Sequence, residues 1–413
     1  MATNTFNNAV KIAKYAMDCL ENNLTFTKFV NRKYESMFMD GGAKGGDTVN
    51  VRIPAKGYAV RHGSAASPQG YTDSYVPITL TQHGADMQFT TAQLELNLED
   101  GEAFKQNVLN PLIAPVANYI DQQGMALAAG IANSVGTPGT LPTTLSPFLD
   151  AGATLDECAV PRDGQWAAIM HPRHQASILS STSTYYNPQS DIAAQYRDGV
   201  LGKLIGGFKF SPDQNAPSMT TGNAPGTPLM NGSTADGAST INVDGWTSGQ
   251  ATLNVGDVLT IAGVYAANPV SKLSTGALKQ FTVTADVDAA GGSTLTVSIF
   301  PALQLAGPNQ NVTALPQADA LMYFWGVSGA TTYNSTSTRE SLLFHPDAFG
   351  LACVDLPKPA SATYCVRVRS PKLNIPIRLI QFYNGSTDQE LYRLDVLFGW
   401  ATLRDQFACR VVG

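Results

Sequence analysis

The chain has 413 residues, a formal net charge of −6 and only 14% charged residues. Because single hydrophobic cores stop growing near ~250–300 residues, this length predicts two or three cores. The sequence has no basic cluster, which argues against direct sequence reading of nucleic acid. It has no apolar run near the ~20 residues of a membrane span and no signal-peptide pattern at its start, so no membrane association is expected.

The low charge content is itself informative. Average domains carry about 25% charged residues, so much of this chain's surface is expected to be covered, most simply by contacts between subunits. The odd number of cysteines and the absence of a CxxC pair predict free thiols in a reducing compartment. The cysteines are Cys19, Cys158, Cys353, Cys365 and Cys409.

Residues 5–39 are amphipathic, with apolar residues at three- and four-residue steps that place them on one helical face. This segment has no core of its own, so its apolar face is expected to pack on a partner or on a distant part of the fold. The apolar residues are Phe6, Val10, Ala13, Met17 and Leu20.

Residues 41–80 begin with a glycine-rich stretch and continue with two alternating runs, Val49–Ile53 and Val76–Leu80. Alternation of this kind predicts half-buried strands, so the segment is expected to form a long two-stranded excursion. The glycine-rich start does not match a phosphate-binding loop, because the spacing gives no GxxxxGK followed by Ser or Thr.

Residues 102–135 carry the strongest helical pattern. Asn110 suits an N-cap, and Pro111 suits the first helical position, where no amide donor is needed. One apolar stripe continues to Val135, which predicts a helix of about 35–40 Å at ~1.5 Å per residue. The stripe consists of Ile113, Val116, Ile120, Leu127, Ile131 and Val135.

Residues 150–214 read as mixed α/β, with a buried strand at Gln165–Met170 and a turn into a helix at His171–His174. The two histidines have the spacing of metal ligands on a helix, but no acidic or cysteine residue stands at a recognised ligand spacing. No motif marks a base for a cysteine nucleophile, and no GxSxG, HExxH or GxGxxG-with-acid pattern occurs. The sequence therefore predicts no catalytic residue, no metal site and no cofactor.

Composition changes sharply over residues 216–330, where the only basic residues are Lys272 and Lys279 and Ser, Thr, Gly and Ala dominate. A mid-chain shift followed by a return to the earlier character indicates one domain inserted into another. Short strand signals in this block predict a small all-β barrel or sandwich. They are Ala251–Asn254, Val258–Val264, Gln280–Val287 and Thr294–Phe300. After the block, strands at Ile375–Tyr383 and Leu391–Trp400 joined by Asn384–Asp388 predict a hairpin.

Read in order, these segments resemble the major coat proteins of tailed double-stranded-DNA phages, which share the Hong Kong 97 capsid fold. They are most similar to the coat proteins of short-tailed Salmonella-type phages, which carry an inserted β-barrel. The likeness is carried by Tyr196-Arg197-Asp198-Gly199 with Gly206-Gly207-Phe208, by Val255–Val264 and by Leu342–Phe349. One departure is Asn223–Ser239, whose single charge is Asp236, so the charged inter-capsomer loop of this family is weakened or differently built here.

The resemblance implies an α+β fold in six parts. These are an N-terminal arm (1–40), an extended β loop (41–80), a peripheral domain with the spine helix (81–149), the first part of an apical domain (150–215), the inserted β-barrel (216–330) and the C-terminal parts of the apical and peripheral domains (331–413).

The function implied by the resemblance is self-assembly into an icosahedral shell around phage DNA, in the host cytoplasm. Expected partners are further copies in hexamers and pentamers, a scaffolding protein, a portal, and DNA contacted non-specifically. Two alternatives remain: an encapsulin-type bacterial compartment, against which the inserted domain argues, and a charge-poor β-rich adhesin or carbohydrate binder, which would predict an export signal.

Two segments of opposite charge are candidate subunit-interface sites. The extended loop carries Lys44, Arg52, Lys56 and Arg61 against Asp47 and Asp73, an excess of two positive charges (four minus two). The segment before the helix is acidic, with Glu95, Glu99, Asp100 and Glu102 near the single Lys105. In the fold that the chain resembles, the extended loop lies over the peripheral part of the next subunit, so these segments are expected to meet. The alternative is that both are solvated charges on unrelated surfaces.

Overall fold

The structure is a computed structural model, and it divides into two compact units that are described separately. It describes residues 17, 24–33, 48–54, 74–90, 110–182, 207–247, 252–288, 294–325, 327–328, 335–359, 364–370 and 373–413. The first unit comprises Met1–Val51, Tyr75–Met125 and Phe349–Leu403. The second comprises Arg52–Ser74, Ala126–Ala348 and Arg404–Gly413. The tracts at residues 195–206 and most of the N-terminal amphipathic segment lie outside the described residues.

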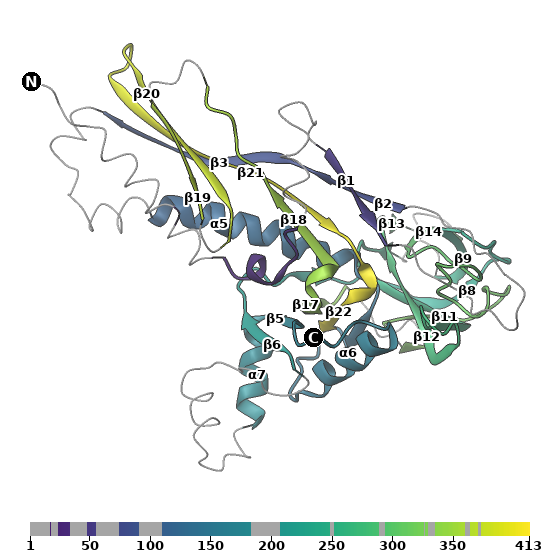
Figure 1. Ribbon diagram of the computed structural model, residues 1–413. Helices are drawn as coiled ribbons and strands as arrows, with labels where there is room; N and C mark the ends of the chain where they lie inside the picture. The colour runs from purple at the N-terminus through teal and green to yellow at the C-terminus, as the bar shows by residue number, and fades with distance from the viewer. Residues whose placement is uncertain are drawn as a thin grey trace, which may run out of the picture. The chain divides into compact units, whose positions relative to one another are not determined.

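The first unit is built on a long antiparallel sheet with the helix α5 beside it (Figure 1). The strand β21 is its centre, because it pairs with β18 near its end and with both β20 and β3 along its length. Its elements are η1 (Phe26–Phe29), β3 (Thr81–Thr90), α5 (Asn110–Met125), β18 (Phe349–Cys353), β19 (Tyr364–Arg369), β20 (Pro376–Asn384) and β21 (Gln389–Thr402).

Two local predictions are confirmed in this unit. β20 and β21 form the expected hairpin, with Asn384 opposite Gln389. β1 (Thr48–Ile53) and β2 (Ser74–Thr79) form a two-stranded sheet. Val51 and Ile78 are buried while the residues next to them are exposed or half-buried, as a period of two requires.

The predicted helix over 102–135 is wrong at its end. α5 stops at Met125, so its 16 residues span about 24 Å at ~1.5 Å per residue. A 3-10 helix, η4 (Ala126–Gly130), and a strand, β4 (Ser134–Gly136), follow. Glycines at 124 and 130 weaken helix formation, and Val135 gains a parallel pairing with Val411 that a helix would forfeit. The apolar spacing alone could not reveal that partner.

The second unit contains a mixed six-stranded sheet in the order β4-β22-β17-β5-β6, with β7 also paired to β17. The buried strand predicted at residues 165–170 is confirmed as β5 (Ala167–Met170), and the following helix as α7 (Pro172–Thr182). The other elements are α6 (Ser146–Glu157), β6 (Lys209–Pro212), β7 (Ser218–Thr220), β17 (Ser337–Phe344), η7 (Pro346–Ala348), η8 (Asp405–Phe407) and β22 (Ala408–Val412).

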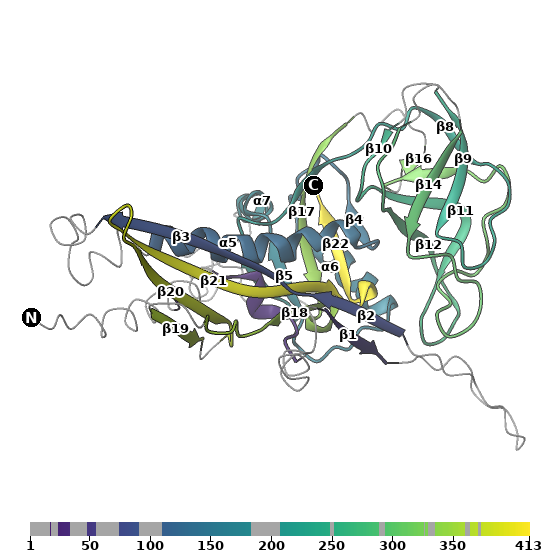
Figure 2. The ribbon, with the colours of Figure 1, turned by 90° about the horizontal axis from the view of Figure 1, so that it is seen from above.

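The inserted segment forms its own seven-stranded antiparallel sheet, in the order β16-β15-β11-β12-β14-β9-β8. Leu229 of β8 bridges to Leu321 beside β15, and Met230 exchanges backbone hydrogen bonds with residues 319 and 320, so the sheet curls into a barrel (Figure 2). The strands are β8 (Gly226–Met230), β9 (Thr240–Trp246), β11 (Val258–Ala267), β12 (Ser274–Val283), β14 (Leu295–Phe300), β15 (Met322–Phe324) and β16 (Val327–Ser328), with a separate pair, β10 (Thr252–Leu253) and β13 (Val287–Asp288).

Alternating residues of these strands fill the barrel. Ile241 and Val243 of β9 point inward with Val297 and Ile299 of β14, while Asn242 and Thr296 lie on the exposed side. The sequence signals found β10, β11, β12 and β14 but missed β8, β9 and β15. β9 and β15 pair with strands distant in the chain, at Leu295↔Val243 and Leu259↔Phe324, and β8 is joined to residue 321 by the bridge from Leu229. Local sequence could not reveal these partners.

The barrel is expected to fold without the rest of the chain, because its strands and most of its core lie within residues 222–329. Expressed alone, this segment should give an all-β circular dichroism spectrum and a cooperative thermal transition. A random-coil spectrum with a broad, non-cooperative transition would contradict this expectation.

None of the described helices is long and apolar enough to cross a membrane.

Candidate subunit contacts and buried anchor points

Of the eight charged residues predicted to meet at a subunit interface, the structure describes one. Arg52 lies on β1 with an exposed side chain. The other seven lie outside the described residues: Lys44, Lys56, Arg61, Glu95, Glu99, Asp100 and Glu102. The pairing of the two charged segments therefore stays a prediction.

Asp121, on α5, holds the N-terminal segment. Its carboxylate accepts hydrogen bonds from the backbone N–H groups of Thr25, Phe26 and Thr27 and from the Thr27 hydroxyl. These N–H groups begin η1, where no intrahelical acceptor exists. Burial raises the pKa of the Asp121 carboxyl above its ordinary value, and the hydrogen bonds offset that rise only in part. A carboxylate distant in sequence thus caps this short helix.

Two aromatic rings pack against each other beside Asp121. Phe26 stacks on Trp400 at 5.3 Å between ring centroids, and Trp400 donates its Nε1–H to the carbonyl of Ile120 at 3.0 Å. A Cβ added at Gly124 would come within 2.8 Å of the Phe26 ring and 2.7 Å of Trp400. The glycine therefore permits the arm, the helix and the central strand of the first unit to approach one another.

In the second unit, β12 of the barrel is joined to the backbone that follows α5. Gln280 donates from Nε2 to the carbonyl of Ser134 and accepts from the Ser134 N–H at Oε1, both at 2.7 Å. Thr282 donates to the carbonyl of Ala129 at 3.1 Å, and Asn268 donates to the carbonyl of Glu157 at 2.7 Å. The Gln280 side chain thus bonds to both backbone groups of Ser134, as the backbone of a neighbouring strand does, and this links the barrel to β4.

A buried ion pair lies where β17, β22 and the end of the barrel meet. Arg410 is fully buried, and its Nη1 donates to Oε1 of Glu340 at 2.9 Å. Its guanidinium lies 5.4 Å from the ring centroid of Trp325 and also reaches the sulfur of Met219. Nε and Nη2 of Arg410 have no hydrogen-bond partner, and among the described residues Glu340 is the carboxylate that is hydrogen-bonded to it. The buried Asp257 carboxyl adds a longer-range electrostatic attraction.

Asp257 fixes the start of the insertion. Its Oδ2 accepts from the N–H groups of Gly222 at 3.0 Å and Asn254 at 2.8 Å. Burial raises the pKa of the Asp257 carboxyl, and those hydrogen bonds act in the opposite direction. A Cβ at Gly222 would lie 2.2 Å from the carbonyl oxygen of Thr252, so this crossing point requires glycine.

The histidine pair that the sequence singled out lies between α7 and β17. The rings of His171 and His174 are 5.8 Å apart, and Nδ1 of His174 lies 2.8 Å from the Ser341 hydroxyl. Burial, and secondly the charge of a protonated His171, lowers the pKa of His174 to about 4. Within the described part of the chain, no three His, Cys, Asp or Glu residues gather as a metal site. The arrangement is that of a neutral, packed imidazole.

His174 should make the second unit sensitive to acid. Between pH 6.5 and about 4 the unfolded chain binds a proton at this histidine and the folded chain does not, so stability falls as the pH falls. A shift from 6.5 to about 4 corresponds to a loss of up to ~3 kcal/mol. We expect His174→Gln to flatten the fall of the urea midpoint over this range. Equal slopes for the variant and the wild type would contradict the assignment.

Sequence reasoning missed Asp121, Glu340 and Arg410. One signal was present: Arg410 is a single charge in the otherwise uncharged strand Ala408–Val412, and such a residue needs a buried counter-charge. The sequence around Glu340 and around Asp121 contains no comparable signal that either carboxylate is buried.

The family of the chain follows from a comparison with models of known families. A model described as P22 coat protein, gene protein 5, matches residues 1–409. The chain belongs to the P22 coat protein family. It is a bacteriophage major capsid protein, copies of which form the icosahedral shell of the virion. The match continues through the inserted barrel, which supports the coat protein over the encapsulin-type alternative.

Solved structures similar to this coat protein include other phage capsids. Mycobacterium phage Che8 matches at 13% identity and a TM-score of 0.47, covering 94% of this chain and 90% of that chain. The capsid of cyanophage P-SCSP1u matches at 11% identity and a TM-score of 0.43, covering 89% and 83%. The CUS-3 coat protein I-domain matches at 24% identity and a TM-score of 0.19, covering 25% of this chain and 97% of that chain. No curated protein sequence matches significantly.

The coat protein has the mixed helix and strand architecture of the Hong Kong 97 capsid fold, as the resemblance implied, with the barrel as an addition. The family is one of structural capsid proteins.

Proposed function

We propose that this coat protein assembles into hexamers and pentamers in the host cytoplasm, with a scaffolding protein and a portal, and that the shell holds double-stranded DNA without reading its sequence. The observation that carries this proposal is the family match over residues 1–409. The acidic net charge and the absence of a basic cluster argue against a surface that reads DNA sequence, so the contact with DNA is expected to be weak and non-specific.

Co-expression tests the proposal. The coat protein should form shells of uniform diameter when it is produced with the scaffolding protein of the same phage, and irregular assemblies when it is produced alone. Electron microscopy distinguishes the two. Subunits that stay monomeric with the scaffolding protein, or uniform shells that enclose protein cargo in place of DNA during infection, would contradict the proposal.

The six-part division of the chain belongs to the same proposal. It is supported by the separate barrel of residues 226–328 and by the two-stranded sheet of β1 and β2. The two compact units do not follow this division throughout; in particular, the chain passes from the first unit to the second between Met125 and Ala126, inside the segment 81–149. The end of α5 at Met125 accounts for that difference.

The charge pattern supports a role for the extended loop in ordering the subunits. Its basic residues would face the acidic segment at Glu95–Glu102 of the next copy. A single exposed ion pair contributes only ~0–1 kcal/mol. Several such pairs repeated around a closed shell would set register and orientation as well as affinity.

Charge reversal tests this arrangement. Arg52→Glu combined with Arg61→Glu should impair assembly while the subunit keeps its circular dichroism spectrum and thermal midpoint. Adding Glu99→Arg and Glu102→Arg should partly restore assembly, because the swapped charges again attract. If the first double variant assembles normally at both low and high salt, the two segments do not pair.

A further inference from the structure

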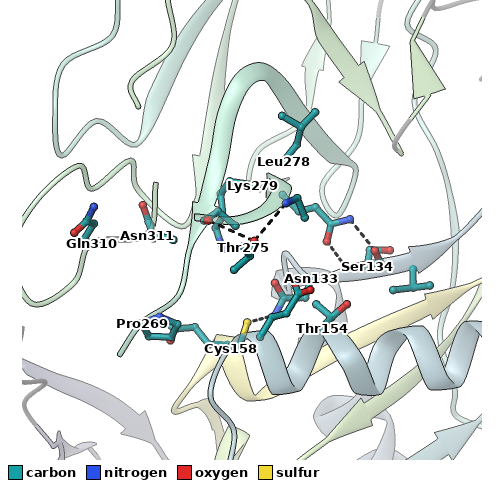
Figure 3. Close-up of a pocket in the computed structure, with 17 residues that line it drawn as sticks. Asn133, Ser134, Thr154, Cys158, Pro269, Thr275, Leu278, Lys279, Gln310 and Asn311 are labelled. Atoms are coloured by element: carbon teal, nitrogen blue, oxygen red, sulfur yellow. Dashed lines mark hydrogen bonds between the residues drawn. The ribbon is translucent and has the colours of Figure 1, made fainter. Parts of the chain in front are cut away.

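A cleft lies in the second unit between the barrel hairpin of β11 and β12 and the segment that runs from β4 to the end of α6 (Figure 3). Its volume is about 210 Å³, which is below the ~300–1,000 Å³ typical of sites for drug-sized ligands. Asn133 and Cys158 line one side, and Lys279, Gln280 and Asn311 line the other. The space suits one side chain or a short organic acid.

Lys279 is the unusual member of this lining. It is 9% exposed, yet it forms no hydrogen bond or ion pair with any residue that the structure describes. The other lysine of the insertion, Lys272, donates to the carbonyl of Pro308 at 2.8 Å. The ammonium nitrogen of Lys279 is not among the buried side-chain atoms that lack a hydrogen-bond partner, so the stem is buried while the charge stays open to solvent in the cleft. The cleft therefore presents a cation that lacks its anion.

The neighbouring groups do not supply that anion. Burial raises the pKa of the Cys158 thiol, and the positive charge of Lys279 offsets this only in part, so the thiol is neutral near pH 7. Glu157 also lines the cleft, but this exposed residue forms no ion pair with Lys279. Most of the amide groups are engaged: Asn133 donates to the carbonyl of Ala408 at 3.1 Å, and Gln280 is paired with Ser134.

We propose that this cleft binds a carboxylate, held by the ammonium group of Lys279. One cation matches one negative charge, and Glu157 at the same cleft disfavours a dianion such as phosphate. A lysine also acts as a point charge with rotatable donors and so accepts a carboxylate without bidentate geometry. The carboxylate comes either from a small acid in solution or from an Asp or Glu side chain of a second copy. Only the second of these, a side chain from another copy, rests on the proposed function, because it requires assembled subunits.

Alkylation of Cys158 provides a local measurement on unassembled subunits, because the thiol lines the same cleft. Propionate should slow the reaction of Cys158 with iodoacetamide about tenfold at ten times its dissociation constant, as followed by peptide mass spectrometry. Propionamide, a neutral analogue, should not slow it. In Lys279→Met the effect of propionate should disappear, whereas the matched control Lys272→Met should keep it. If propionate and propionamide slow the reaction equally, or neither does, the proposal is overturned without recourse to any variant.

Thermal denaturation adds an independent test. Lys279→Met keeps an apolar stem of similar length and removes the charge, so it provides the reference protein that cannot hold a carboxylate. Propionate should raise the wild-type midpoint by roughly 2–4 °C per ~1 kcal/mol of binding linkage and leave the variant unchanged. Equal shifts for both proteins would overturn the proposal.

Assembled shells then distinguish the two sources. If a neighbouring subunit provides the carboxylate, Cys158 in shells is protected without propionate, and Lys279→Met shells lose that protection. If the source is solution, shells respond to propionate as subunits do. Failure of assembly would leave the subunit measurements intact, so the binding and the proposed function are tested separately.

Discussion

Replacing Glu340 by leucine is expected to destabilise the coat protein by about 3–5 kcal/mol, because the fully buried Arg410 would lose the carboxylate to which it is hydrogen-bonded. The effect should appear as a lower urea midpoint of the second unit, followed by the fluorescence of the tryptophans. Trp325 lies over the Arg410 guanidinium, so its emission should report the change directly.

Two further variants test whether the loss of stability comes from the buried ion pair of Glu340 and Arg410. Glu340→Leu combined with Arg410→Met removes both charges, and its stability should return close to that of the wild type. Asp156→Ala breaks the exposed pair with Arg162, whose side chains are 37% and 60% exposed, and should change stability by no more than ~1 kcal/mol. If the single variant is as stable as the double variant, Glu340 is not the partner on which Arg410 depends.

Replacing Asp121 by alanine should detach the N-terminal segment from α5 and destabilise the first unit by about 3–5 kcal/mol. The change leaves the N–H groups of Thr25, Phe26 and Thr27 without their acceptor, and each buried donor left unsatisfied costs about 1–3 kcal/mol. Limited proteolysis should then cleave near residues 24–31 at lower protease concentrations than in the wild type.

Asp150→Ala is the matched control, because Asp150 is an exposed aspartate on α6. Its effect should stay within about 0.5 kcal/mol, as for most surface substitutions. If Asp121→Ala resists proteolysis as well as the control does, the aromatic contacts of Phe26 hold the segment by themselves, and the capping role of Asp121 is refuted.

Both predictions concern residues that join distant parts of the chain. Asp121 is 94 residues or more from the groups it binds, and Glu340 is 70 residues from Arg410. Each of these points fixes a segment within its own unit: Asp121 holds the N-terminal segment on α5, and Glu340 holds β22 beside β17. Loss of either point should therefore impair assembly at temperatures where the subunit remains folded, which measurement of shell yield would show.

The sequence alone was sufficient where the signal is local. Alternation predicted β1, β2 and the hairpin of β20 and β21, because a strand with one buried face repeats every two residues whatever it pairs with. The composition shift likewise revealed the insertion, and the order of the segments indicated the coat protein family that the family model confirms.

Other features were decided by tertiary structure. The stripe from Ile113 to Val135 is apolar throughout, yet its last residues leave the helix because β4 pairs with β22, more than 270 residues later in the chain. The missed strands β8, β9 and β15 depend in the same way on pairing across the barrel. The sequence marks Arg410 as a single charge in an apolar strand, but it does not show that Glu340 is the partner, nor that Lys279 lines a cleft. Burial and pairing arise only when distant segments pack, and periodicity within one segment carries no information about them.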